Sequence, residues 1–177
     1  VDRALRVERL VVKVGHAGTL DQRASGLLIV CLGKATRFIS YFQEMSKQYT
    51  ARIRLGIRTA TDDLDGAVIS RIPVPDGLDQ SALDALIPIF SGTIMQTPPE
   101  YSALKIEGKR ASDRVRAGES ITLAPRPITI HSLSARLEQD GEIALDVHVS
   151  KGTYIRSLAR DIGQALGTEG TISVLRR

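Results

Sequence analysis

The chain has 177 residues, of which 42% are hydrophobic and 25% charged, so it can bury one core and is too balanced in composition for wholesale disorder. The single cysteine, Cys31, excludes a disulfide framework and a thiolate metal cluster, and the three histidines lack metal-ligand spacing. The longest apolar run, 26–33, is far shorter than the roughly 18 residues of a membrane span. We therefore expect one domain, a cytoplasmic location, and neither a metal nor a membrane partner.

Charge is distributed unevenly along the chain, whose formal net charge is +4. Residues 1–58 carry 11 basic and 4 acidic groups, residues 59–104 carry 1 and 7, and residues 105–177 carry 12 and 9. This pattern favours a basic surface that meets a polyanion and an acidic face turned away from it. Two solvated basic faces without a partner would give the same pattern. The start at Val1 and the stop straight after an apolar stretch suggest a piece of a longer protein.

Hydrophobic spacing predicts the following elements in the first half of the chain. After a lead-in over 2–14 we expect a glycine-punctuated loop over 15–25, a central strand over 27–32, a helix over 34–45, a half-buried strand over 49–55, an acidic loop over 58–66 and a strand over 67–72. The helix is indicated by Ala35, Phe38, Ile39 and Phe42, which share one helical face.

The second half predicts more strands than helices. Ser81, with Asp84 as its capping-box partner, is expected to cap a helix that ends early because of Pro88. The remaining expectations are a long basic loop over 100–120 with a short helix inside it, antiparallel strands over 121–130, 132–137 and 143–149 with a turn at 139–141, a helix over 154–166 that ends at Gly167, and a strand over 171–175. Because strands and helices do not alternate regularly, the predicted class is α+β around a mixed, mainly antiparallel sheet flanked by helices and loops.

A titratable pair, His16 and Asp21, lies among glycines directly before the strand predicted at 27–32. Glycine lets the backbone approach a ligand closely, so this loop is a candidate site. Equally, Asp21 could only cap a turn and His16 could be a satisfied polar residue. The chain contains neither of the glycine-rich signatures of nucleotide phosphate binding.

A second candidate site is the segment 150–156, which joins a predicted strand to a predicted helix. Arg156 falls near the start of that helix, where the helix dipole does not favour a cation. A specific carboxylate or phosphate partner would explain its position, whereas a surface arginine without any partner is the simpler alternative. Tyr49 is, by its pattern alone, a strand tyrosine with a half-buried ring.

Taken together, these segments resemble the TruB family of tRNA pseudouridine synthases. The two most specific motifs are Gly-His-Ala-Gly-Thr-Leu-Asp over 15–21 and Lys-Gly-Thr-Tyr-Ile-Arg over 151–156. Further matches follow the family's order along the chain, over 24–28, 47–49, 55–59, 62, 65–66, 96–99, 101–105, 126–128 and 175–177. The sequence departs from the family at Ser112, where a tyrosine is expected, and it lacks the family's Lys-Pro-x-Gly start and its C-terminal RNA-binding domain.

The resemblance implies roles for individual residues. Asp21 falls on the catalytic aspartate, Arg156 on the arginine paired with it, and Tyr49 on the tyrosine that stacks against the target base. A neighbouring Arg156 would keep Asp21 charged. The positions implied to bind substrate are His16, Tyr154 and Leu175 around the flipped base, and Lys105, Lys109 and Arg110 in an insertion at about 96–126 that contacts RNA.

The resemblance also implies a fold and a function. The fold is the pseudouridine-synthase fold, with 1–177 as a single catalytic domain. The reaction isomerises a specific uridine in the T-loop of tRNA, breaking the N1–C1′ bond and rejoining the base through C5. It is redox-neutral, so we expect no cofactor and no metal, and we expect a monomer. The alternatives are a catalytically idle RNA-binding fragment and a relative that acts on rRNA or depends on a guide RNA.

Overall fold

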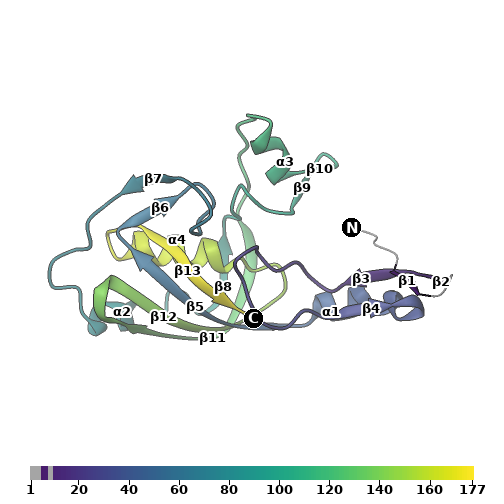
Figure 1. The fold of residues 1–177 in the computed structure, drawn as a ribbon. Helices are drawn as coiled ribbons and strands as arrows, with labels where there is room; N and C mark the ends of the chain where they lie inside the picture. Colours follow the sequence, from purple (N-terminus) through teal and green to yellow (C-terminus); the bar gives the residue numbers. More distant parts are fainter. Residues whose placement is uncertain (1–4, 8–9) are drawn as a thin grey trace.

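A five-stranded antiparallel sheet forms the centre of the protein in the computed structural model, which describes residues 5–7 and 10–177 (Figure 1). Residues 1–4, 8 and 9 of the predicted lead-in lie outside the described residues. In spatial order the strands are β13 (Gly170–Arg176), β5 (Lys47–Leu55), β12 (Glu142–Val149), β11 (Arg126–Leu137) and β8 (Gly92–Gln96). Every neighbouring pair is antiparallel, which confirms the predicted α+β class with a mainly antiparallel sheet.

One face of the sheet is buried and the other is open. In β5, Ala51, Ile53 and Leu55 are buried, while the alternating Arg52 and Arg54 are exposed. This period of two is the one expected for a strand with a single covered face. The covering element is helix α4 (Ile155–Ala165), whose buried side chains join those of the strands in one hydrophobic core. The strand predicted at 49–55 and the helix predicted at 154–166 are confirmed.

Helix α4 lies very close to strand β13 because two glycines meet there. A Cβ on Gly163 would lie 2.3 Å from the Gly170 nitrogen, and one on Gly170 would lie 2.2 Å from the Ala159 carbonyl oxygen. Both distances are far below van der Waals contact, so any side chain would push the helix off the strand. The start of α4, which carries Arg156, is thereby held at a fixed height above the sheet.

Helix α2 (Gln80–Leu86) and the edge of the sheet show two corrections. The cap of α2 is Asp79, whose carboxylate accepts a hydrogen bond from the Ala82 N–H at 2.9 Å, and not Ser81, which lies inside the first turn. A negative charge at this position also interacts favourably with the helix dipole. The strands predicted at 121–130 and 132–137 are one strand, β11, with a register shift between Ile130 and Ser132, and the strand begins only after Pro125.

An arm extends from the sheet on the side of the N-terminus (Figure 1). It contains β1 (Leu5–Val7), β2 (Leu10–Val12), β3 (Val14–His16), β4 (Val30–Leu32), the 3₁₀-helix η1 (Gly33–Phe38) and helix α1 (Ile39–Glu44). The helical segment predicted at 34–45 is thus confirmed, although its first half is 3₁₀. The strand predicted at 27–32 is shorter than expected and is not central, because β4 pairs only with β3 and exposes Val30 and Leu32.

Two further pieces project from the sheet. The acidic loop is bounded by β6 (Ile57–Thr59) and β7 (Val68–Arg71), which pair with each other. The segment 103–125, here called the insertion, rises away from the sheet and contains β9 (Lys105–Ile106), β10 (Lys109–Arg110) and α3 (Ala111–Arg116) (Figure 1). The expected short helix within a long loop is therefore confirmed. The 3₁₀-turn η2 (Gln139–Gly141) joins β11 to β12 where a hairpin turn was predicted.

Candidate active site

An aspartate and an arginine 135 residues apart form a two-pronged ion pair above the end of the sheet. Arg156 Nε donates to Asp21 Oδ2 at 2.9 Å, and Arg156 Nη2 donates to Asp21 Oδ1 at 3.1 Å. The arginine side chain is 8% exposed, whereas the carboxylate is 37% exposed. The paired guanidinium is thus part of the protein interior, and the carboxylate keeps a face that a ligand can reach. This geometry gives Asp21 both a fixed orientation and a stabilised negative charge.

Two further donors of Arg156 bind backbone carbonyls. Nη1 donates to the Thr61 carbonyl at 2.8 Å, and Nη2 donates to the Tyr101 carbonyl at 3.1 Å. A second carboxylate, Asp63, has an oxygen 3.8 Å from Arg156 Nε. Three separate loops therefore converge on one guanidinium, which explains why a buried cation is tolerated at the start of α4.

A second buried arginine on α4 fixes the acidic loop. Arg160 Nη1 donates to Asp62 at 3.0 Å, and its Nη2 donates to the Thr97 carbonyl at 2.9 Å. Burial raises the pKa of the Asp62 carboxyl, and the nearby arginines, above all Arg160, oppose that rise. Asp62 has a φ of 58°, in the left-handed region, and its carbonyl accepts from the Ile172 N–H of β13. The loop that supplies Thr61 and Asp63 to Arg156 is thereby anchored on both sides.

A cavity of about 430 Å³ opens beside Asp21. Asp21 and Arg156 line it together with three tyrosines, Tyr49, Tyr101 and Tyr154. Ligand pockets span about 300–1,000 Å³, so the space suits a small group such as one nucleobase with its sugar. The lining also includes four basic residues, Lys47, Arg110, Arg116 and Arg177, and apolar residues such as Leu175.

The phenol of Tyr49 is a titratable group of this cavity with a shifted pKa. Burial raises the pKa of Tyr49 above its usual value, while the nearby charge of Arg177 acts in the opposite direction. The phenol consequently stays protonated at neutral pH and presents a neutral ring with one hydroxyl. Burial also lowers the pKa of Lys47, and the charge of Arg177 adds to that effect.

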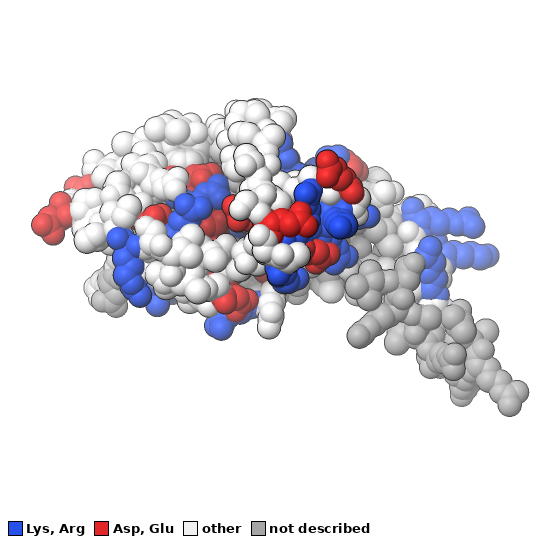
Figure 2. Space-filling view, turned by 90° about the horizontal axis from the view of Figure 1, so that it is seen from above, with Lys and Arg blue, Asp and Glu red and all other residues white. Residues whose placement is uncertain are grey.

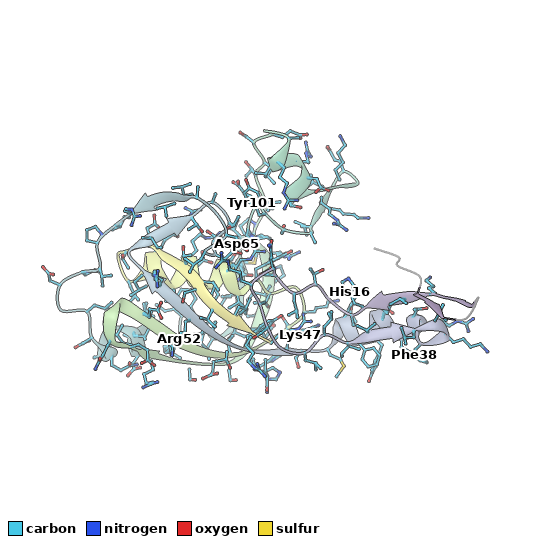
Figure 3. All side chains as sticks on the ribbon, in the orientation of Figure 1. His16, Phe38, Lys47, Arg52, Asp65 and Tyr101 are labelled. Carbon is cyan, nitrogen blue, oxygen red and sulfur yellow. The ribbon has the colours of Figure 1, made fainter. Side chains whose placement is uncertain are left out.

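The cavity gathers six of the residues singled out in the sequence and leaves three outside its lining. Those that line it are Asp21, Tyr49, Arg156, Tyr154, Leu175 and Arg110. His16 lies in β3 on the arm, which Figure 3 shows displaced from the centre of the site near Tyr101. Lys105 and Lys109 lie in the small hairpin of the insertion. Within the described part of the chain, no cluster of three or more His, Cys, Asp or Glu could hold a metal ion.

Sequence reasoning missed several residues at the site. Tyr101 and Arg177 belong to quoted motifs but were given no role, and Asp63 was passed over between Asp62 and Asp65. The acidic loop could have supplied a signal for Asp63, because its three carboxylates are candidate partners for the arginine predicted near the start of the helix. Nothing in the spacing indicates that the end of the last strand reaches the loop of Asp21.

The amino-terminal domain profile of TruB family pseudouridylate synthases matches residues 3–155. The chain belongs to this family. A curated relative, "tRNA pseudouridine synthase B" of Arthrobacter sp. (strain FB24), is 48% identical over 172 residues, which cover 93% of the chain and 56% of the relative. The protein of the same name from Thermobifida fusca (strain YX) is 44% identical, with 99% of the chain and 63% of the relative covered. The chain thus spans little more than half the length of the curated relatives it matches.

Solved structures give the same family. The crystal structure of a Cbf5-Nop10-Gar1 complex contains a chain that is 30% identical, with a TM-score of 0.66 over 93% of this protein and 39% of that chain. An H/ACA RNP bound to a substrate RNA containing 2′-deoxyuridine contains one that is 26% identical, with a TM-score of 0.63. These matches confirm the expected pseudouridine-synthase fold. Among the helices that the structure describes, none is long and apolar enough to cross a membrane.

Proposed function

We propose that this chain is the catalytic part of a tRNA pseudouridine synthase, which isomerises one uridine in the T-loop. The observation that carries the proposal is the half-open Asp21 carboxylate, held by the buried Arg156 at the floor of a nucleotide-sized cavity. Cleavage of an N1–C1′ bond followed by closure of a C5–C1′ bond needs an ionised carboxylate next to the sugar carbon. Asp21 meets that requirement either as a nucleophile or as a base.

The cavity walls support the same reaction. A target uridine has to leave its stack, which costs roughly a few kcal/mol. An aromatic ring that stacks on the base returns about 1–3 kcal/mol. The rings of Tyr49 and Tyr154 line the cavity, and Leu175 offers an apolar surface against which a detached uracil can turn. The reaction moves one proton from C5 to N1 and changes no oxidation state, so atoms and electrons balance without a cofactor.

The relatives support tRNA as the substrate of this chain. The proteins named tRNA pseudouridine synthase B are 44–48% identical, whereas the chain from the Cbf5-Nop10-Gar1 complex is 30% identical. Identity is therefore higher toward proteins named for tRNA than toward that chain or the 26% identical chain of the H/ACA RNP. The ion-paired carboxylate and the aromatic walls argue against a catalytically idle fragment. We also infer a single catalytic domain over 1–177, with 96–126 contacting RNA, in a monomeric cytoplasmic protein.

The test is to incubate the 177-residue chain with an unmodified tRNA transcript and to map pseudouridine by chemical labelling, with Asp21→Asn as the inactive control. In parallel, we test a chimera in which residues 15–177 of this chain replace the matching part of the Arthrobacter relative. The relative then supplies the RNA-binding parts that lie outside this chain. We expect pseudouridine at one T-loop position, without any added guide RNA. If neither protein forms pseudouridine above the level of the control, the proposal is wrong.

A further inference from the structure

We infer that Arg177 is a positioning residue of this active site, which ties the Asp21 loop to the end of the sheet and faces the Tyr49 hydroxyl. The inference deepens the proposed function and rests on it. It assigns a task to a guanidinium that lines the catalytic cavity but makes no ion pair with Asp21 among the described residues.

The side chain of Arg177 binds the loop on both sides of Asp21. Its Nε and Nη2 donate to the Leu27 carbonyl at 3.1 and 3.0 Å. Its Nη1 donates to the Thr19 carbonyl at 3.3 Å, and Nη2 also reaches the Gly18 carbonyl at 3.5 Å. A planar guanidinium can serve several carbonyls at once because its donors have fixed directions, which a lysine ammonium cannot reproduce.

The backbone of the same residue binds the loop as well. The Leu27 N–H donates to the Arg177 carbonyl at 2.9 Å, and the Arg177 N–H donates to the Ser25 carbonyl at 3.0 Å. Between them lies Gly26, with a φ of 108°, where a Cβ would lie 2.1 Å from the Arg177 carbonyl oxygen. This contact leaves no room for a side chain, so the loop and the last strand meet backbone to backbone.

The other neighbour of the guanidinium is Tyr49. Both side chains line the catalytic cavity, and the charge of Arg177 lowers a phenol pKa that burial raises. Arg177 thus lies beside the wall expected to stack on the base and holds the loop that carries the reacting carboxylate. Fixing these two groups relative to each other is what a near-attack geometry requires, since a misplacement of about 1 Å can cost about a hundredfold in rate.

A matched control stands next to this residue. Arg176 is the exposed last residue of β13 and directly precedes Arg177, so the side chains of these two neighbours leave the extended backbone in opposite directions. Arg177→Gln removes both the positive charge and the planar set of N–H donors, here called the fork of donors. Arg177→Lys keeps the charge beside Tyr49 but cannot hold three carbonyls. Arg176→Gln removes one positive charge from the same strand without touching the loop.

The experiment has two readouts. The first is the ultraviolet titration of tyrosinate in the free chain, in which Tyr49→Phe identifies the signal of Tyr49. The second is the single-turnover rate on saturating tRNA transcript, together with RNA affinity. In Arg177→Gln we expect the Tyr49 titration to move to higher pH and the rate to fall about 10- to 100-fold, with a much smaller change in affinity. Arg177→Lys should keep the titration and recover only part of the rate, and Arg176→Gln should match wild type in both.

The inference is overturned if Arg177→Gln titrates and turns over like Arg176→Gln. If Arg177→Gln does not fold, Arg177→Lys decides, because a wild-type rate in that variant would show that the fork of donors is dispensable. The titration needs no RNA and no turnover. A chain without any pseudouridine activity would therefore refute the proposed function, while the titration would still test the contact between Arg177 and Tyr49.

Discussion

Asp21 and Arg156 form an ion pair in which the two side chains have different roles. The guanidinium is buried and uses its donors on one carboxylate and two backbone carbonyls, so it cannot move to follow a substrate. The carboxylate is exposed on the cavity side and is the only one of the two that a sugar can approach. Arg156 therefore orients and stabilises the charge on Asp21, and Asp21 performs the chemistry.

Asp21→Asn should abolish turnover while the fold and RNA binding are kept. The amide is almost isosteric and still accepts a hydrogen bond from Arg156, so we expect a loss of about 1–3 kcal/mol in stability from the weaker pairing of a buried cation. The measurements are pseudouridine formation, RNA affinity and urea unfolding. Pseudouridine above the level of a reaction without protein would contradict the role of Asp21.

Tyr49 lends itself to a test that separates its ring from its hydroxyl. Tyr49→Phe keeps the stacking surface, and Tyr49→Ala removes it, with a loss of about 1–3 kcal/mol in RNA binding. If the hydroxyl takes part in proton transfer, the phenylalanine variant binds RNA normally and turns over poorly. Affinity and single-turnover rate, measured on the same transcript, separate the two effects. Wild-type behaviour of both variants would remove Tyr49 from the site.

At the scale of elements, the start of α4 is held by an edge strand. Gln96 is 1% exposed, its Nε2 donates to the Tyr154 carbonyl at 3.0 Å, and its Oε1 accepts from the Tyr154 N–H at 2.9 Å. Its cross-strand partner Arg126 donates to the Gly152 carbonyl at 3.0 Å and lies over the Tyr154 ring at 5.2 Å from the centroid. These two residues fix the turn that precedes Arg156.

Gln96→Leu should therefore impair both stability and catalysis. The substitution leaves the Tyr154 N–H without a partner, while the Tyr154 carbonyl keeps only the Leu158 N–H at 3.1 Å, so we expect a cost of about 1–3 kcal/mol. Met95→Gln, at an exposed neighbouring position of the same strand, should change stability by no more than about 0.5 kcal/mol. Urea unfolding measures the difference, and the turnover of the folded fraction reports on the position of Arg156. Equal stability of the two variants would show that the contact to Tyr154 contributes nothing.

The elements that the sequence predicted well are those whose burial follows from local spacing. Strand β5 alternates buried and exposed residues, and α4 carries its apolar face at helical intervals, so both could be located without tertiary information. The segment 27–32 was predicted to be a central strand because it is apolar. An apolar run does not reveal whether the sheet or a smaller element such as the arm will cover it. The ion pair between Asp21 and Arg156 was accessible only through family resemblance, since nothing local to either residue brings together positions 135 apart.

For the molecule as a whole, the three charge blocks are arranged differently from the simple expectation. The acidic stretch is not wholly turned away from the site, because Asp62, Asp63 and Asp65 approach Arg160, Arg156 and Arg23 respectively. The pairs of Asp62 and Asp63 lie in the interior of the protein, whereas Asp65 and Arg23 pair at its surface. Seen from above, Lys and Arg gather around the middle of the molecule and recur on the arm (Figure 2).

The insertion carries five basic and three acidic groups, and a sixth basic residue, Arg126, follows it at the start of β11. Arg114 is paired with Glu119 at 2.6 Å and with Glu107 at 3.4 Å, so its charge is partly used within the insertion. Lys109 and Arg110 are exposed and have no carboxylate within salt-bridge distance among the described residues. At its base the insertion is anchored by the Ser112 N–H, which donates to the carbonyl of the buried Ser102 at 3.1 Å. The exposed hairpin over 105–110 is therefore the part available to RNA.

Replacing Lys109 and Arg110 together with alanine should weaken RNA binding in a salt-dependent manner. Each lost phosphate contact releases fewer counterions, so the slope of log affinity against log salt should fall by about 1–2. The matched control replaces Arg52 and Arg54, two exposed arginines on the open face of the sheet near Glu142, and should leave the slope unchanged.

Trypsin should cut the free protein after Lys109 or Arg110, and bound RNA should protect these bonds, because an exposed hairpin opens at little cost in free energy. An unchanged slope together with unchanged cleavage would mean that the hairpin never meets RNA, and that the basic groups of residues 1–58 form the binding surface instead.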